Sequence, residues 1–124
     1  MTQKEQALLT AALNRYGGRN QIVKAMEELA EAIRALSRVY QESDETDSTE
    51  LILGRMNLAE ELADVGIMTD QMKLLLPDVD YMTRLYRKAK MNRLEKRLSD
   101  EGGGAACGRE DHAHGAERRR SMGL

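Results

Sequence analysis

The chain has 124 residues, of which 41% are apolar and 32% are charged, and it contains no Phe or Trp. This length allows one domain with a small core of aliphatic side chains and Met. The formal net charge of -2 argues against broad affinity for nucleic acids, and a single cysteine excludes an internal disulfide and fits a reducing cytosol. Without a membrane-length apolar run or a secretory signal, we expect a cytoplasmic protein.

The composition and the spacing of apolar residues predict an all-α fold of four helices, the first short and the other three longer. The chain opens with a capping box, in which Thr2 caps the first amides and Glu5 reaches back. A short helix follows and ends at Gly17 and Gly18. Its expected inward residues are Leu8, Ala11, Ala12 and Tyr16.

A second helix is expected from Asn20, its predicted N-cap, to about Tyr40. Apolar residues recur along it at steps of four and three, which predicts packing along another helix at a shallow angle. These residues are Ile22, Met26, Leu29, Ile33, Leu36 and Tyr40. Glu28 and Glu31 lie one turn apart and away from this row, which fits a solvated face. However, the neighbouring Ala25, Ala32 and Ala35 would let another helix or subunit approach that side closely.

A polar loop over residues 41–49 precedes a third helix, which Asp47 and Glu50 are expected to cap. One face of residues 57–76 is apolar, with Leu58, Leu62, Val65, Thr69, Met72 and Leu76. A neighbouring strip carries Asn57, Glu61, Asp64, Met68 and Leu75. A buried carboxylate needs a partner or a cation. We therefore hypothesise that Glu61 and Asp64 point into a protein interior and hold metal there.

Pro77 separates this helix from a fourth, expected over residues 79–98, whose partly inward residues are Val79, Met82, Tyr86, Ala89 and Leu94. Its other faces are strongly basic. Residues 1–98 are expected to form the helical domain, and the Gly- and Arg-rich residues 99–124 a disordered tail. Cys107, His112 and His114 lie in that tail without a scaffold for a metal site, and the basic residues 118–120 are interpreted as a solvated terminus.

The two acidic pairs, Glu28 with Glu31 and Glu61 with Asp64, converge if their helices pack antiparallel. Four carboxylates that close together repel one another and are tolerable only around cations. Oxygen ligands select hard ions, so Mg²⁺ is expected, with Mn²⁺ as the other candidate. Either motif alone occurs by chance in many charged helices. Their combination on successive helices, followed by a basic helix, is the stronger signal.

These motifs resemble those of the MazG-like branch of the all-α nucleoside triphosphate pyrophosphohydrolases. The family's Glu-Glu-x-x-Glu motif matches residues 27–31, and its Glu-x-x-Asp motif matches residues 61–64. The similarity covers roughly residues 16–98. It implies a MazG-like bundle completed by oligomerisation, as a homodimer or homotetramer, because a lone chain of this size would struggle to cover both faces of the third helix.

The resemblance also implies an activity and a set of site residues. Glu28, Glu31, Glu61 and Asp64 would hold Mg²⁺, and a nucleoside triphosphate would be cleaved between its α- and β-phosphates to the monophosphate and pyrophosphate. Glu31 and Glu61 are assigned to catalysis, with Glu31 the first candidate for the general base, although the sequence does not choose among the four carboxylates. Lys90 and Arg93 fit a Lys-x-x-Arg-Leu pattern for phosphate contacts, or belong to a solvated face.

The roles of three other residues and two other functions stay open at this stage. Glu27 and Glu60 either support the ligands or are simply exposed, and Lys24 can be the surface ion-pair partner of Glu28. The alternative function is a non-catalytic helical interaction module whose acidic motifs are solvated. A weaker third reading is nucleic-acid binding through the fourth helix and the tail. Neither a membrane nor a nucleic-acid partner is expected.

Overall fold

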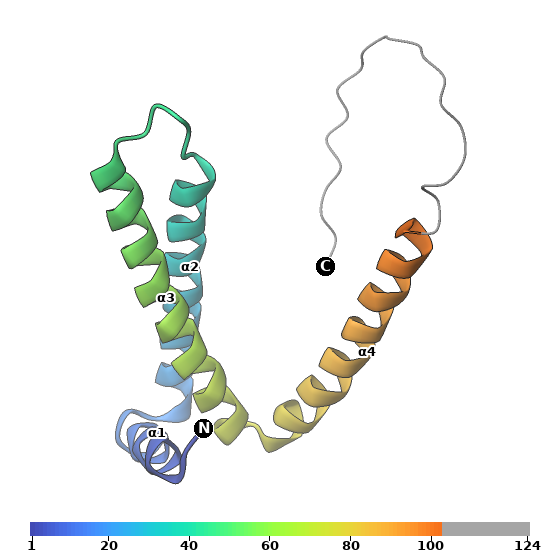
Figure 1. Ribbon diagram of the computed structural model, residues 1–124. Coiled ribbons are helices and arrows are strands. Elements are labelled where there is room, and N and C mark those ends of the chain that lie inside the picture. Colours follow the sequence, from blue (N-terminus) through green and yellow to red (C-terminus); the bar gives the residue numbers. More distant parts are fainter. Residues whose placement is uncertain (103–124) are drawn as a thin grey trace. The chain divides into compact units, whose positions relative to one another are not determined.

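The computed structural model describes residues 1–102, and this part of the chain consists of four α-helices without a strand (Figure 1). The helices are α1 (Gln3–Tyr16), α2 (Gly18–Tyr40), α3 (Ser48–Leu75) and α4 (Pro77–Gly102). The predicted all-α class and the short first helix are confirmed. No helix in these residues combines the length and the apolar character that crossing a bilayer requires.

The chain divides into two units, Met1–Arg87 and Lys88–Leu124. The first unit holds α1, α2, α3 and the first turns of α4, and the second unit holds the remainder of α4. Helix α4 runs past its expected end at Leu98 to Gly102. Cys107, His112, His114 and the basic residues 118–120 lie outside the described residues.

The two ends of α1 follow from a capping box at its start and a glycine at its junction with α2. The predicted capping box is present, because Thr2 Oγ1 accepts from the Glu5 amide at 3.2 Å and the Thr2 amide donates to Glu5 Oε2 at 2.6 Å. Gly17, with φ of 84°, reverses the chain in a conformation that side chains disfavour. The prediction that Asn20 caps α2 is wrong. Helix α2 already begins at Gly18, and Asn20 Nδ2 donates to the Tyr16 carbonyl at 2.8 Å, closing the end of α1 instead.

The loop that joins α2 to α3 is held by a helix cap, an ion pair and a buried glycine. Asp47 is the N-cap of α3, and its Oδ2 accepts from the Thr49 amide at 2.8 Å, which confirms the expected start of this helix. Arg55 Nη2 donates to Glu42 Oε2 at 3.1 Å, which links α3 to the loop that follows α2. Gly54 is buried beside this pair, and a Cβ there would lie 3.3 Å from Glu42 Oε1.

Helices α2 and α3 lie side by side and antiparallel (Figure 1). Their shared face buries Ala32, Ala35 and Met68 together with Glu28 and Gln71. The prediction that the large apolar row of α2 packs along another helix is wrong within the described part of a single chain, where the row is exposed. Helix α3 approaches the alanine side of α2 because small side chains allow close contact between backbones, and it meets that side with the strip that carries Glu61, Asp64 and Met68.

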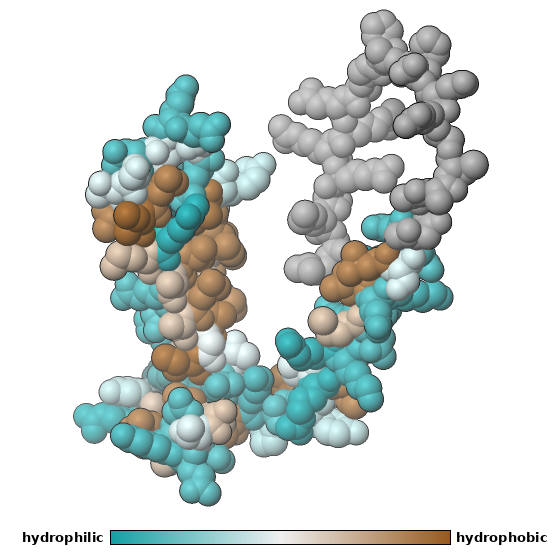
Figure 2. All heavy atoms as spheres, viewed as in Figure 1, coloured by the Kyte–Doolittle hydropathy of each residue, from teal (hydrophilic) through white to brown (hydrophobic). Residues whose placement is uncertain are grey.

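The apolar row of α2 is left largely uncovered, so that Met26, Leu29 and Ile33 are between 52% and 63% exposed. Figure 2 shows apolar surface along the α2–α3 pair. On the apolar face of α3, Leu58, Val65 and Met72 are half-buried, whereas three residues expected to turn inward there are exposed. Several residues of α1 and α4 that were expected to turn inward are exposed as well. The exposed residues are Leu62, Thr69 and Leu76 in α3, Leu8, Ala11 and Tyr16 in α1, and Val79, Met82, Tyr86, Ala89 and Leu94 in α4.

Candidate metal centre

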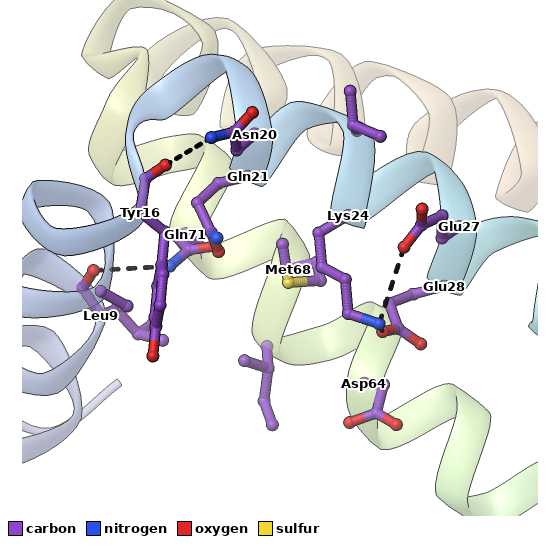
Figure 3. Close-up of a pocket in the computed structure, with 13 residues that line it drawn as sticks. Leu9, Tyr16, Asn20, Gln21, Lys24, Glu27, Glu28, Asp64, Met68 and Gln71 are labelled. Atoms are coloured by element: carbon purple, nitrogen blue, oxygen red, sulfur yellow. Dashed lines mark hydrogen bonds and ion pairs between the residues drawn. The ribbon is translucent and has the colours of Figure 1, made fainter.

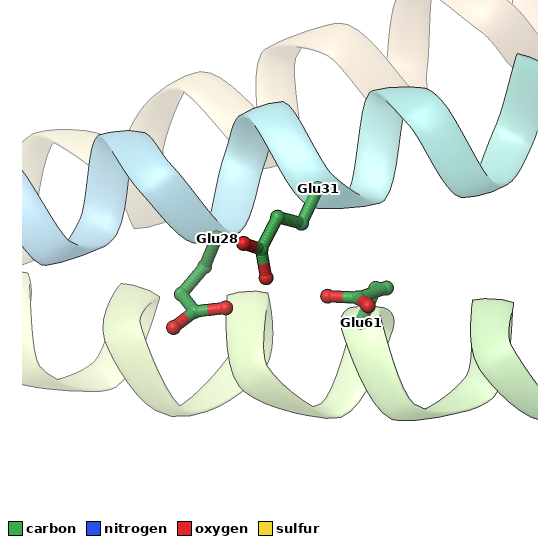
Figure 4. A group of neighbouring side chains, drawn as sticks. All are labelled: Glu28, Glu31 and Glu61. Atoms are coloured by element: carbon green, nitrogen blue, oxygen red, sulfur yellow. The ribbon is translucent and has the colours of Figure 1, made fainter.

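Three carboxylates meet midway along the α2–α3 pair. Glu28 and Glu31 come from α2, Glu61 comes from α3, and one oxygen of each lies within 4.8 Å of the others (Figure 4). Glu28 and Glu31 project together because residues three apart are neighbours on a helix. Glu61 faces them because its strip on α3 is the one that packs against α2. The convergence expected from the two motifs is therefore present for these three residues.

The carboxylates of the cluster differ in how far they are exposed to solvent. The side chain of Glu28 is only 7% exposed, whereas that of Glu31 is 42% exposed. Glu28 forms an ion pair with Lys24 Nζ, one turn earlier on α2, and Glu31 lies 3.5 Å from Arg34 Nη2. The pKa of Lys24 is raised, chiefly by its hydrogen bond to Glu28. The predicted Lys24–Glu28 pair is thus confirmed.

Glu61 is the carboxylate whose charge is least well compensated. Its pKa is raised above the ordinary value, first by desolvation and then by repulsion from Glu31, Glu28, Asp64 and Glu60. No cation of the protein pairs with Glu61 among the described residues. A site that leaves one carboxylate desolvated and repelled by its neighbours is one that an added cation would stabilise.

The remaining predicted site residues lie outside this trio. Asp64 is half-buried one turn further along α3 and lines a cavity together with Glu28, so its role as a ligand stays a prediction. Lys90 and Arg93 are both exposed on α4, in the unit that begins at Lys88, and their phosphate contacts stay a prediction as well. Glu60 is exposed, which is one of the two alternatives given for it above.

The donor set fits a hard divalent cation. Mg²⁺ takes oxygen ligands at about 2.1 Å in an octahedron, so its ligand oxygens lie about 3 to 4 Å apart. The three oxygens need to close by only a fraction of their present spread of up to 4.8 Å. The side chains of Glu31 and Glu61 are not fully buried and can rotate to do this. Three carboxylates leave the other positions of an octahedron to water or substrate oxygens.

A cavity of about 640 Å³ adjoins the cluster, within the size range of small-molecule sites (Figure 3). One end is lined by Lys24, Glu27, Glu28 and Asp64, and the other by residues of α1, α2 and α3, including Leu9, Asn20 and Gln71 (Figure 3). The sequence reasoning missed Gln71. The signal was available, because position 71 continues the strip of Glu61, Asp64 and Met68 at the same three- and four-residue steps.

No family model, curated protein or solved structure matches the chain. The fold and the site therefore define a class only: an all-helical protein in which an antiparallel helix pair presents three carboxylates beside a cavity. The functional argument depends on the geometry of these residues.

Proposed function

We propose that the protein is a Mg²⁺-dependent nucleoside triphosphate pyrophosphohydrolase. The observation that carries the proposal is the meeting of Glu28, Glu31 and Glu61 from two helices, next to a cavity large enough for a nucleotide. Three carboxylates, of which Glu61 has no protein cation as a partner among the described residues, favour a divalent metal. A metal with open coordination positions beside such a cavity suits a substrate that carries phosphates. The motif resemblance described above supports the same reading.

The proposed reaction is hydrolysis at the α-phosphorus. A water oxygen attacks that atom, the bond from it to the oxygen that bridges the α- and β-phosphates breaks, and the products are a nucleoside monophosphate and pyrophosphate. When bound, Mg²⁺ supplies neutralisation of the phosphate charge and acidifies the attacking water. The protein holds the cation with its carboxylates and accepts the proton that the water loses.

Glu31 and Glu61 are the candidates for the residue that accepts this proton. Both are accessible from solvent, unlike Glu28, whose carboxylate is buried and already paired with Lys24. The raised pKa of Glu61 favours it as general base, because a base accepts a proton best when its pKa lies near the working pH. Lys24 lines the cavity and is proposed to contact a phosphate. The phosphate contacts of Lys90 and Arg93 stay a proposal that rests on the resemblance alone.

The test is an assay of purified protein with Mg²⁺ or Mn²⁺ and a panel of NTPs and dNTPs, in which pyrophosphate is measured. We expect turnover of at least one nucleotide, and a loss of roughly 100-fold or more in kcat for Glu61→Gln and Asp64→Asn. Glu60→Gln is the matched control, because it removes a neighbouring charge from an exposed position on the same helix. Absence of turnover and of metal binding, or equal loss in the control, would overturn the proposal.

We also propose that a second copy of the chain covers the exposed apolar row of α2, as a homodimer or homotetramer. Only Ala32, Ala35 and Met68 are buried apolar residues in the described part of the chain, which is too small a core for a stable lone domain. Leu29 of α2, Val65 of α3 and Val79 of α4 line one cavity of about 160 Å³, so the uncovered apolar surface is continuous between helices.

The same exposed row favours the second candidate function, a non-catalytic helical interaction module. Such a module would use the apolar face and leave the carboxylates solvated. The two functions separate in the nucleotide assay, because only the hydrolase needs Glu61 and a divalent cation.

A further inference from the structure

Gln71 is the most deeply buried polar side chain in the described residues, and it is incompletely bonded. It is 2% exposed and lines the cavity beside the carboxylate cluster. Its Nε2 donates to the carbonyl of Leu9 in α1 at 3.5 Å, while its Oε1 is buried and lacks a hydrogen-bond partner (Figure 3). Buried polar atoms without a partner are rare, because they cost stability. This oxygen therefore points to a ligand group that donates a hydrogen bond.

The orientation of the amide follows from its neighbour. The Leu9 carbonyl can only accept, so the nitrogen of Gln71 turns toward α1 and the oxygen toward the other side. Because the nitrogen is already engaged, Gln71 presents an acceptor. A ligand that donates at this point is bound, and one that presents a carbonyl oxygen there is repelled.

The cavity places this acceptor about a nucleoside's length from Asp64, the α3 carboxylate that lines the same cavity. Gln71 and Asp64 are seven residues apart on α3, and Gln21 and Glu28 are seven apart on α2, which is about 10 Å along either helix. Leu9 and Tyr16 line the Gln71 end of the cavity together with Asn20 and Gln21, so this end is mixed apolar and polar without a charged group. Lys24, Glu27 and Glu28 make the opposite end charged (Figure 3). A nucleobase, which has apolar ring faces and polar edge atoms, suits the Gln71 end. A phosphate with its metal suits the charged end.

We infer that Gln71 accepts a hydrogen bond from the exocyclic amino group of the substrate's base, so that the site prefers adenine and cytosine nucleotides to those with an oxo group at the same position. The inference rests on the proposed function and names its substrate class. The ligand reaches Oε1 when a neighbouring side chain rotates. Gln21 and Met68 line the same cavity and have unbranched, rotatable side chains.

The experiment compares matched nucleotide pairs that differ at this position: ATP with ITP, and CTP with UTP. With Mg²⁺ present, we expect kcat/KM to favour the amino member of at least one pair by about tenfold or more. In Gln71→Leu, which keeps the size of the side chain and removes the acceptor, the ratio should fall toward one. Gln6→Leu, at an exposed glutamine of α1, is the control and should keep the ratio.

Two further readouts separate the possible outcomes. A purely structural role for Gln71 changes the melting temperature of Gln71→Leu but leaves the nucleotide ratio unchanged, and that result overturns the inference while the hydrolase proposal stands. Binding of AMP over IMP, measured by calorimetry, does not need turnover. If this preference is present and depends on Gln71, the base reading stands even where hydrolysis fails. If neither binding nor turnover distinguishes the pairs, the inference is wrong.

Discussion

At the scale of single residues, the carboxylate cluster is a set of charges that the protein balances only in part. Lys24 compensates Glu28, the most buried member, and Arg34 lies near Glu31. Glu61 has no such partner in the described residues, and its pKa is raised by desolvation and by the acids around it. The charge that folding leaves unbalanced is therefore at Glu61, and a divalent cation would balance it.

This imbalance predicts how stability depends on pH. Because the pKa of Glu61 in the folded chain lies above its ordinary value of 4.5, the folded state holds this proton more tightly than the unfolded state does. Without metal, the stability that Glu61 contributes is present below the ordinary pKa and is lost as the pH rises through the raised pKa. We expect Glu61→Gln to lack this loss and to melt at a higher temperature than the wild type at neutral pH.

Added Mg²⁺ should reverse the order of the two proteins. It binds the deprotonated carboxylates, so the wild type should gain melting temperature with increasing Mg²⁺, and the gain should grow with pH. Glu61→Gln should gain much less. Thermal melts with and without Mg²⁺, from below the ordinary pKa of Glu61 up to neutral pH, measure both effects. Equal responses of the two proteins would argue against a shared cation site.

At the scale of helices, the alanine side of α2 determines the site. Ala32 and Ala35 are buried against α3, and they lie on the same side of α2 as Glu28. If these positions carried large side chains, the helices would separate and Glu61 would move away from Glu28 and Glu31. The close approach of the α2 and α3 backbones and the convergence of the acids therefore depend on the same small residues.

Larger side chains at this contact are expected to weaken both folding and metal binding. Ala35→Leu should lower the free energy of unfolding by about 1–3 kcal/mol, because a buried position without free space must accept extra volume. Ala30→Leu is the matched control at an exposed position of the same helix and should change stability by less than about 0.5 kcal/mol. Urea denaturation of the two variants measures the difference. A control as destabilising as Ala35→Leu would contradict this account of the contact.

The helices and the acidic trio could be predicted from the sequence, whereas the packing face of α2 could not. Capping residues, glycines and Pro77 are local signals, so the number and approximate limits of the helices followed directly. The two acidic pairs predicted that four carboxylates converge, and the structure brings three of them together: Glu28, Glu31 and Glu61. However, hydrophobic periodicity identifies an apolar row without identifying the element that covers it. The row of α2 was predicted to pack along another helix, and the alanines were noted only as a side that another helix or subunit could approach. Helix α3 packs on the alanines. Gln71 was missed because only the apolar and acidic residues of the strip were considered, although position 71 continues the strip.

At the scale of the whole molecule, the described part of the chain has more apolar surface than it covers. Its three buried apolar residues form a small core, whereas the row of α2 from Ile22 to Tyr40 is exposed along its length. A second copy is the proposed cover for this surface.

The proposed assembly predicts the effect of a charge placed in this row. Ile33→Glu should reduce the measured mass in solution toward that of a single chain and lower the stability, because the carboxylate would be buried between copies. Ala30→Glu introduces the same charge on α2 outside the row and should leave the assembly intact. Light scattering coupled to size-exclusion chromatography measures both. A wild-type protein that is a stable monomer at micromolar concentration would contradict the assembly.

The most direct test of the carboxylate cluster as a metal centre is a Mn²⁺ titration followed by electron paramagnetic resonance. The account predicts saturable binding of Mn²⁺ to the wild-type chain, competition by Mg²⁺, and an affinity reduced by about 100-fold in Glu61→Gln but retained in Glu60→Gln. Equal affinity in all three proteins, or no saturable binding to the wild type, would contradict it.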